Sequence, residues 1–210
     1  MGELKMKVIL LNGSPRANGC THTALKIIEQ ELVNEGIEVK FYEVGNKPVI
    51  GCTGCGGCRK LGECVHGGLV NEVSKELESA DGFIVGSPVH YAAASGTVTS
   101  LLDRLFYSTD KNHLRHKFGA SIVSCRRGGA SAAFDQLNKY FTINEMPIVS
   151  SVYWNQIHGN TPEEVVQDLE GVRTMKILAR NMAYLIKCKE AAKNIPVPEL
   201  VPVVRTNFIR

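Results

Sequence analysis

Short apolar runs alternate with amphipathic segments along most of this chain. Residues 7–11 are almost continuously apolar, which is typical of a strand that is covered on both faces. Apolar residues at helical spacing predict helices between the strand-like runs. The predicted strands are 7–11, 38–44, 82–86, 118–124 and 148–153, and the predicted helices between them are about 21–34, 69–79, 97–106 and 131–141. Strands that alternate with helices predict an α/β fold, in which a parallel sheet carries helices on both faces.

The starts of two helices have their own signals, and the C-terminal segment differs from the rest of the chain. Thr21 or Thr23 is predicted to cap the first helix. The sequence Thr161-Pro162-Glu163-Glu164 has a capping threonine, a proline at the first helical position and a glutamate that completes a capping box, so it predicts the start of the longest helix. We divide the chain into a domain at 1–190 and an extended, apolar, proline-containing tail at 191–210, which we expect to pack on the domain or on a partner subunit.

Composition and charge narrow the function classes. The 210 residues suit one large or two small domains, and the net charge of +3 without a basic run disfavours nucleic acid as a partner. No apolar stretch reaches the ~18 residues that a membrane span needs, and the N-terminal segment lacks the features of a signal peptide. The number of cysteines is odd, at seven. We therefore expect a cytoplasmic protein without a disulfide scaffold.

Four of the cysteines, Cys52, Cys55, Cys58 and Cys64, lie within a glycine-rich loop predicted at 48–68. Their close spacing suits thiolate ligation of an iron–sulfur cluster, although the fourth cysteine lacks the proline that follows it in bacterial ferredoxins. Zinc is a weaker alternative, because the two cysteine pairs of a structural zinc site are usually separated from each other by more than three residues. A reduced loop that binds nothing is the third interpretation, and the spacing alone does not decide among them.

The loop after the first predicted strand has the composition of an anion site. Ser14, Thr21 and Thr23 offer hydroxyl groups and Arg16 offers a positive charge, beside the N-terminus of a predicted helix. This combination predicts binding of a phosphate monoester. The loop lacks the lysine of a nucleoside-triphosphate P-loop, which disfavours ATP hydrolysis. It also lacks the pattern G-x-G-x-x-G, which disfavours a dinucleotide site. The alternative is a polar turn with capping threonines, and Cys20 is predicted to be an ordinary loop or helix-surface residue.

Three more loops follow strands at the same predicted sheet edge, where ligands bind in such folds. The loop 87–91 could present backbone amides and an aromatic face to a planar ring, with His90 as a proton donor or merely as part of the wall. The loop 124–129 combines flexible glycines with two arginines, which could stabilise an anionic ring or could simply lie at the surface. Trp154 could stack on a ligand or pack in the core.

Taken in order, these motifs resemble the NAD(P)H-dependent FMN reductase family, a branch of the flavodoxin-like proteins. The resemblance is carried by Asn12-Gly13-Ser14-Pro15-Arg16, by Ser87-Pro88-Val89 and by the segment 95–104, which ends in Leu101-Leu102-Asp103-Arg104. The cysteine loop is similar to that of the iron–sulfur flavoprotein subgroup. One departure is that Val65-His66-Gly67-Gly68 stands where the family often has paired aspartates.

The resemblance implies a flavodoxin-like three-layer sandwich with a five-stranded parallel sheet of order 2-1-3-4-5, and FMN bound at the sheet edge. The implied phosphate ligands are Ser14, Arg16, Asn18, Thr21 and Thr23. The expected neighbours of the flavin ring are Pro88, Val89, His90, Tyr91, Ser124, Cys125, Arg126, Arg127, Gly128, Gly129 and Trp154. Family members are commonly dimers, so a homodimer or a higher homo-oligomer is expected.

Three functions are compatible with this interpretation. The first is an FMN-dependent oxidoreductase that takes hydride from NAD(P)H and passes electrons to a small-molecule acceptor such as a flavin or quinone, without a catalytic side chain. The second is an iron–sulfur flavoprotein that exchanges electrons with a ferredoxin-like donor through FMN and a [4Fe–4S] cluster on Cys52, Cys55, Cys58 and Cys64. The third is a flavin-binding regulatory module without turnover.

Overall fold

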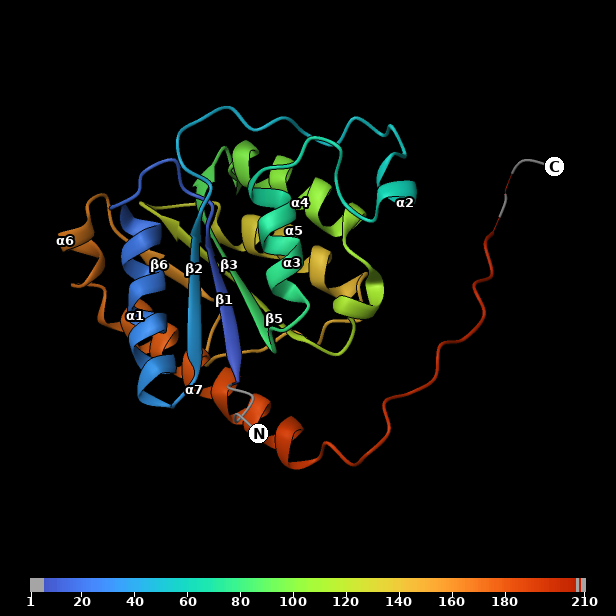
Figure 1. The fold of residues 1–210 in the computed structure, drawn as a ribbon. Helices are drawn as coiled ribbons and strands as arrows, with labels where there is room; N and C mark the ends of the chain where they lie inside the picture. The colour runs from blue at the N-terminus through green and yellow to red at the C-terminus, as the bar shows by residue number, and fades with distance from the viewer. Residues whose placement is uncertain (1–5, 207, 209–210) are drawn as a thin grey trace.

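A parallel sheet forms the centre of the fold (Figure 1). The computed structural model describes residues 6–206 and 208, so residues 1–5, 207, 209 and 210 of the predicted domain and tail lie outside the described part. The parallel strands lie in the order β2 (Glu38–Glu43), β1 (Lys7–Asn12), β3 (Gly82–His90), β5 (Phe118–Cys125) and β6 (Gln156–His158). This order confirms the predicted flavodoxin-like sheet. A short antiparallel strand, β4 (Ala93–Ala94), pairs with the end of β3 and was not predicted.

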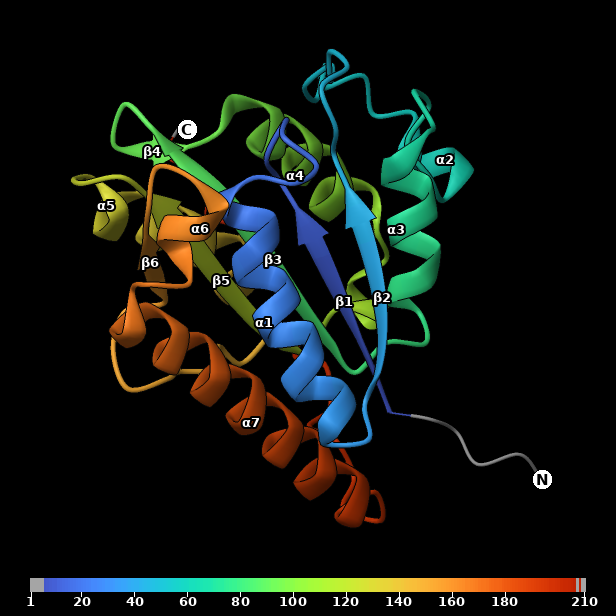
Figure 2. The ribbon, with the colours of Figure 1, turned by 90° about the vertical axis from the view of Figure 1, so that its left-hand side faces the viewer.

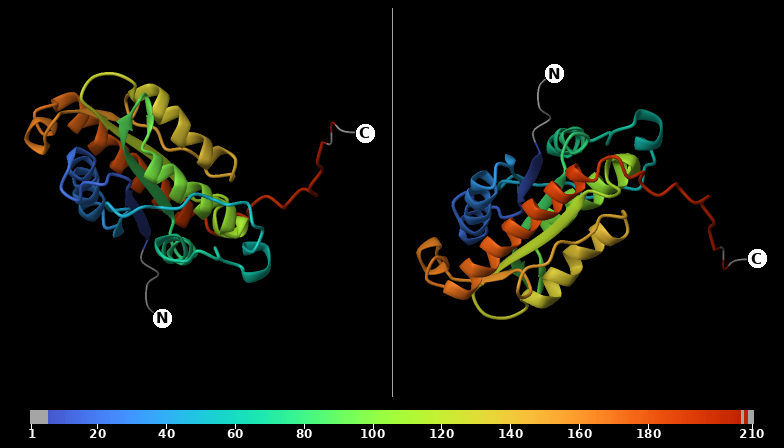
Figure 3. Two further views of the ribbon diagram at one scale, coloured as in Figure 1. Left: turned by 90° about the horizontal axis from the view of Figure 1, so that it is seen from above. Right: turned by 90° about the horizontal axis from the view of Figure 1, so that it is seen from below.

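Helices cover both faces of the sheet (Figures 2 and 3). The longer helices are α1 (Cys20–Asn34), α3 (Leu69–Leu77), α4 (Gly96–Ser108), α5 (Ala130–Thr142) and α7 (Leu169–Ala191). Helices α1 and α7 pack on each other and supply one hydrophobic core, whereas α3, α4 and α5 supply the other. The remaining helical segments are short: α2 (Cys58–Leu61), the 3₁₀ turn η1 (Lys111–His113) and α6 (Pro162–Val165). The three predicted layers are therefore present.

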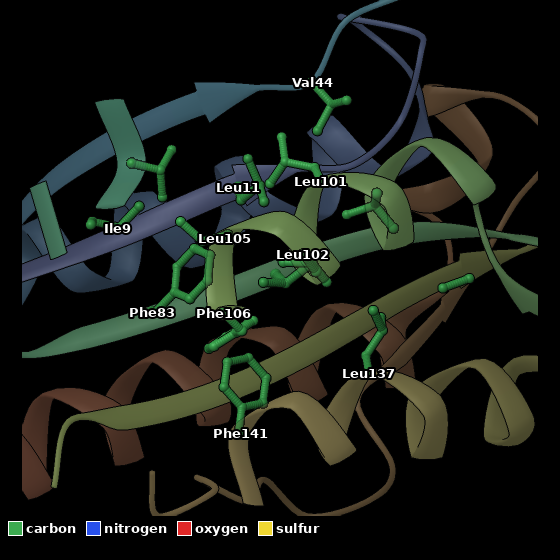
Figure 4. Packing of buried hydrophobic residues seen from close by; sticks show 14 of the residues in the cluster. Ile9, Leu11, Val44, Phe83, Leu101, Leu102, Leu105, Phe106, Leu137 and Phe141 are labelled. Atoms are coloured by element: carbon green, nitrogen blue, oxygen red, sulfur yellow. The ribbon is translucent and has the colours of Figure 1, made fainter. Parts of the chain in front are cut away.

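The continuous apolar character of β1 follows from burial on both sides. Ile9 and Leu11 point into the core beneath α3, α4 and α5, while Val8 and Leu10 point into the core beneath α1 and α7. Figure 4 shows the first of these cores, in which Phe83 of β3 packs among leucines of α4. Each fully buried leucine or phenylalanine contributes roughly 1.5–3 kcal/mol relative to exposure. The paired cores hold β1 and β3 rigidly, and the loops at their carboxyl ends with them.

The prediction of the fifth strand at 148–153 is wrong, because that strand, β6, lies at Gln156–His158. Ile148 forms only an isolated bridge with Gly119, and the chain then leaves the sheet before it returns as β6. The Ser151 hydroxyl donates a hydrogen bond to the carbonyl of Tyr153 and closes a turn. Val152, Tyr153 and Trp154 are exposed, whereas Asn155, which directly precedes β6, is buried. The strand-like apolar pattern there therefore reflects a surface patch of Val152, Tyr153 and Trp154.

The predicted long helix from Thr161 is two helices. Thr161 caps the single turn α6, and its hydroxyl accepts a bond from the Glu164 amide as predicted. The Glu164 carboxylate, however, accepts from the Asn160 amide rather than from that of Thr161, so the capping box is incomplete. Asp168 starts the second helix, α7, because its carboxylate accepts hydrogen bonds from the amides of Gly171 and His158.

Two further boundaries differ from the prediction. Strand β3 continues through Pro88 to His90 instead of ending at Gly86. Pro88 lies beyond the pairing of β3 with β1, which ends at Gly86, and keeps a partner only in β5, where it pairs with Ser124. Helix α1 begins after Gly19, which provides no side-chain cap, so the prediction of a capping threonine is wrong.

The C-terminal tail runs away from the sheet in extended form (Figure 1). Its apolar side chains are exposed, and the Arg115 guanidinium donates a hydrogen bond to the carbonyl of Pro198. In the part of the chain that the structure describes, none of the helices combines the length and the apolar character needed to cross a membrane.

Candidate functional site

A cavity of about 320 Å³ lies at the carboxyl ends of β1, β3 and β5. Its volume is within the usual range for cofactor pockets. The predicted residues that line it are Ser14, Arg16, Thr21, Pro88, Val89, His90, Ser124, Cys125 and Arg126. Pro15, Cys20, Gly159 and Asn160 also line it. The cavity therefore joins loops that are more than a hundred residues apart in sequence, at the edge where the strand order predicts a ligand.

The loop after β1 is held by short-range hydrogen bonds. The Ser14 amide donates to the Asn12 side chain at 3.1 Å, and the Arg16 amide donates to the Ser14 hydroxyl, also at 3.1 Å. The α1 N-terminus follows directly and carries no side-chain cap. Its free amides and positive dipole end can therefore accept an anion, next to the exposed guanidinium of Arg16.

Gly13 is required where this loop leaves the strand. A Cβ atom added to Gly13 would lie 2.6 Å from the Cβ of Val98 and 2.7 Å from the carbonyl oxygen of Gly86. Ser95 fixes the same position, because its hydroxyl donates to the Gly13 carbonyl at 2.8 Å while its amide donates to the Ser87 hydroxyl at 2.9 Å. These contacts place the first loop against the start of α4.

Not all of the residues that were predicted to bind the phosphate border the cavity. Thr21 is buried in the first turn of α1, and its hydroxyl lies 2.8 Å from that of Ser124, which ties the start of α1 to the end of β5. Thr23 donates its hydroxyl to the Gly19 carbonyl inside the helix, and neither Thr23 nor Asn18 lines the cavity. Only Ser14, Arg16 and Thr21 of the five predicted residues therefore border it.

The loop after β3 turns sharply beyond the cavity. Tyr91 and Ala92 have positive φ angles of 50° and 58°, and the Tyr91 side chain is fully exposed and does not line the cavity. Gly129 has a φ of 90°, and a Cβ there would lie 2.7 Å from the Ala92 Cα. This glycine thus permits close approach between two protein loops. Arg127, Gly128 and Gly129 lie beyond the cavity lining.

Two cysteine thiols border the cavity, and burial raises the pKa of both. The Cys125 sulfur is buried and lies 3.4 Å from Nδ1 of His158, and the Cys20 thiol donates to the Gly159 carbonyl at 3.6 Å. Both are therefore neutral thiols at pH 7 and weak nucleophiles. The sequence could not identify Cys20 as a lining residue, because its contact with Gly159 joins distant segments.

Trp154 does not reach the cavity within one chain. The residue is 53% exposed, and its indole ring lies beside Tyr153, with 4.8 Å between the ring centroids. The predicted stacking residue is thus part of the exposed patch that precedes β6.

The cysteine loop forms a separate site on the outside of α4. Cys52, Cys55, Cys58 and Cys64, none of which is in a disulfide, line one small cavity together with Arg104 and Tyr107. Two loop glycines, Gly54 and Gly56, have positive φ angles, and the single turn α2 begins at Cys58. The Cys64 backbone is anchored to α3, because its amide donates to the Asn71 side chain and its carbonyl accepts from it.

The residues that replace the family's paired aspartates also have structural contacts. Val65 packs against Gly57, and the Gly67 carbonyl accepts a hydrogen bond from Arg104. His66 Nε2 lies 3.4 Å from the Thr53 hydroxyl. Hydrogen bonds from the Gly57 amide and the Thr53 hydroxyl lower the pKa of the Cys55 thiol, which favours the thiolate form.

The family follows from comparison with known proteins. A family model described as NADPH-dependent FMN reductase matches residues 6–161. The chain belongs to the NADPH-dependent FMN reductase family. As a family member it is a flavoprotein oxidoreductase whose cofactor is FMN.

Individual relatives agree with this assignment. The chain is 31% identical over 189 residues to an iron–sulfur flavoprotein of Methanocaldococcus jannaschii, covering 87% of this chain and 98% of the relative. A second iron–sulfur flavoprotein of that organism is 33% identical over 198 residues, covering 88% and 98%. A flavodoxin structure from the domain Archaea superposes with a TM-score of 0.59 at 16% identity, covering 87% and 99%, which supports the flavodoxin-like fold.

Proposed function

We propose that this family member is an iron–sulfur flavoprotein that transfers electrons between a ferredoxin-like donor and a small-molecule acceptor. The observation that carries the proposal is that all four clustered cysteines, as free thiols, line one cavity. The two relatives at 31% and 33% identity, which are iron–sulfur flavoproteins by name, support it. Bound FMN supplies a ring that can exchange electrons singly or in pairs, and a bound cluster exchanges them singly.

The residues at the sheet edge suit FMN. Ser14, Arg16 and the uncapped N-terminus of α1 would hold the phosphate, because they combine hydroxyl, guanidinium and free amide donors. The backbone of 88–90 and of 124–126 would border the flavin ring. Arg126 would place positive charge beside the ring, which favours an anionic reduced form.

The residues of the cysteine loop suit a [4Fe–4S] cluster better than zinc. In residues 6–206 and 208, no three Cys, His, Asp or Glu side chains converge closely enough to hold a single metal ion. A zinc ion needs its sulfur ligands about 2.3 Å away on all sides. The four thiolates of a cluster bind four different iron atoms, so they stand further apart. The cavity that the four cysteines line measures about 20 Å³, and the positive φ angles of Gly54 and Gly56 mark the points where the loop backbone is least restricted by side chains.

Hydride transfer from NAD(P)H to FMN is the second candidate function. It is favoured by the family match and by the exposed arginines, Arg126 and Arg127, which could pair with a dinucleotide phosphate beside the cavity. The two donors are distinguished by reducing anaerobic protein either with NADH or NADPH or with a reduced ferredoxin. Rapid bleaching of the flavin absorption by ferredoxin, and not by nicotinamide, supports the first function. The opposite result supports the second.

Both functions would be wrong if neither donor reduced protein that contains FMN. In that case the chain would be a flavin-binding module without turnover.

Self-association is part of the proposal. The tail exposes Ile195, Val197, Leu200, Val201, Val203 and Val204, and such an apolar strip is stabilised when it packs on another surface. We expect light scattering to give a dimer or larger assembly for the full chain, and a smaller mass for a chain that ends at Asn194. A monomeric full-length chain would contradict this part.

A further inference from the structure

Arg104 is a buried cation that pairs with no carboxylate in residues 6–206 and 208. It lies in the second half of α4, and only 6% of it is exposed. Among the described residues, no Asp or Glu forms an ion pair with it. A buried guanidinium is strongly unfavourable unless a negative group compensates it. The compensating group must therefore be found among the other neighbours of Arg104.

The neighbours of Arg104 are in the cysteine loop. Its Nε lies 3.3 Å from the Cys64 sulfur and donates to it, and its Nη2 donates to the Gly67 carbonyl at 2.8 Å. Arg104 also lines the same small cavity as the four cysteines. The planar guanidinium thus binds the segment 64–67 at two points, the Cys64 sulfur and the Gly67 carbonyl, a geometry that lysine cannot reproduce.

We propose that Arg104 positions Cys64 and supplies the counter-charge for an iron–sulfur cluster, so that it raises the reduction potential of that cluster. This inference rests on the proposed [4Fe–4S] site. Reduction adds one electron to the iron–sulfur core and breaks no bond, so the site becomes more negative by one unit. A nearby buried cation and a hydrogen bond to a ligand sulfur both favour the more negative state.

Arg59 provides a matched control on the same loop. It is also an arginine next to the cysteines, but it is exposed to solvent and donates to the Tyr107 hydroxyl instead of to a sulfur. Solvent screens an exposed charge, so its removal should change the cluster potential much less. Neither Arg104 nor Arg59 lines the cavity assigned to FMN, so the flavin potential serves as an internal reference.

The test is an anaerobic redox titration with dithionite, monitored by absorption and electron paramagnetic resonance, after iron and sulfide analysis of each protein. We expect Arg104→Gln to lower the equilibrium constant for cluster reduction at least tenfold, which is about 59 mV for one electron. The flavin potential should stay unchanged, and Arg59→Gln should give a much smaller shift. Arg104→Lys keeps the charge but not both hydrogen bonds, so its potential should lie between those of wild type and Arg104→Gln.

Three results would overturn the inference. They are a wild-type cluster potential in fully loaded Arg104→Gln, an equal shift in Arg59→Gln, or a wild-type potential in loaded Arg104→Lys when Arg104→Gln loses its iron. Wild-type protein without iron after anaerobic reconstitution is a different failure, because it removes the proposed cluster itself. The iron analysis therefore separates an error about Arg104 from an error about the function.

Discussion

The cavity at the sheet edge and the cysteine loop are built in different ways. The cavity lies at the ends of three central strands, and buried hydrogen bonds such as that between Thr21 and Ser124 join its loops. The cysteine loop lies outside the sheet and is attached through Arg104 and Asn71. Figure 1 shows it on the side of the molecule opposite α6, and the two cavities share no lining residue. The fold itself therefore positions the first site, whereas a few side chains position the second.

This difference predicts that the two sites can be emptied independently. The largest effect is expected from Cys64→Ser, because a hydroxyl is a poor substitute for a thiolate on iron. Iron and sulfide should be almost completely lost while FMN content stays that of wild type. Cys188→Ser is the matched control, since Cys188 is exposed on α7, far from the loop in sequence. Loss of FMN together with iron would show that the sites depend on each other.

The converse variant weakens the FMN site alone. Arg16→Gln removes the guanidinium that borders the cavity, and a charge-assisted hydrogen bond contributes about 1.5–3 kcal/mol. We expect the Kd for FMN, measured by fluorescence quenching with apoprotein, to rise about tenfold or more. Iron content should not change. Arg127→Gln removes an arginine that does not line the cavity, and an equal loss of affinity there would contradict the assignment of Arg16.

A smaller effect tests how rigidly the sheet holds the first loop. Gly13→Ala forces a Cβ against Val98 and the Gly86 carbonyl, which is expected to lower the free energy of unfolding by about 1–3 kcal/mol. The Kd for FMN should rise as well, because the loop carries Ser14 and Arg16. Thermal unfolding and FMN titration measure the two quantities. Gly96→Ala is the control, since nothing lies within 4 Å of a Cβ there.

The smallest effect on either site is expected from a change at a distant helix start. Asp168→Ala removes the N-cap of α7 and the partner of the His158 amide, so it should destabilise the fold by about 2 kcal/mol. FMN and iron contents of the folded protein should nevertheless match those of wild type. A selective loss of one cofactor would show that α7 supports that site directly.

The sequence predicts the sheet well because the central strands are buried on both faces. Nearly continuous apolar runs such as 7–11 leave little choice of structure, and the strand order confirms that interpretation. The fifth strand was misplaced because Val152, Tyr153 and Trp154 are apolar but exposed. The predicted long helix is divided into α6 and α7 because the Asp168 carboxylate accepts a hydrogen bond from the His158 amide. The local spacing of apolar residues does not contain that information.

The candidate site was predictable in its loops but not in its individual side chains. The predicted loops do meet at one cavity, yet Asn18 and Thr23 do not line it, because Thr23 turns its hydroxyl to the Gly19 carbonyl. Cys20 lines it although its sequence context is unremarkable. The contact between Arg104 and Cys64 joins positions forty residues apart, so only the folded chain identifies it.

The central claim is that one chain holds two separate redox centres, and the most direct measurement is the cofactor content of anaerobically purified and reconstituted protein. Wild type should contain about one FMN with about four iron and four sulfide atoms per chain, and Cys64→Ser should contain FMN alone. FMN without iron in the wild-type protein, under conditions that reconstitute a control ferredoxin, would contradict the account.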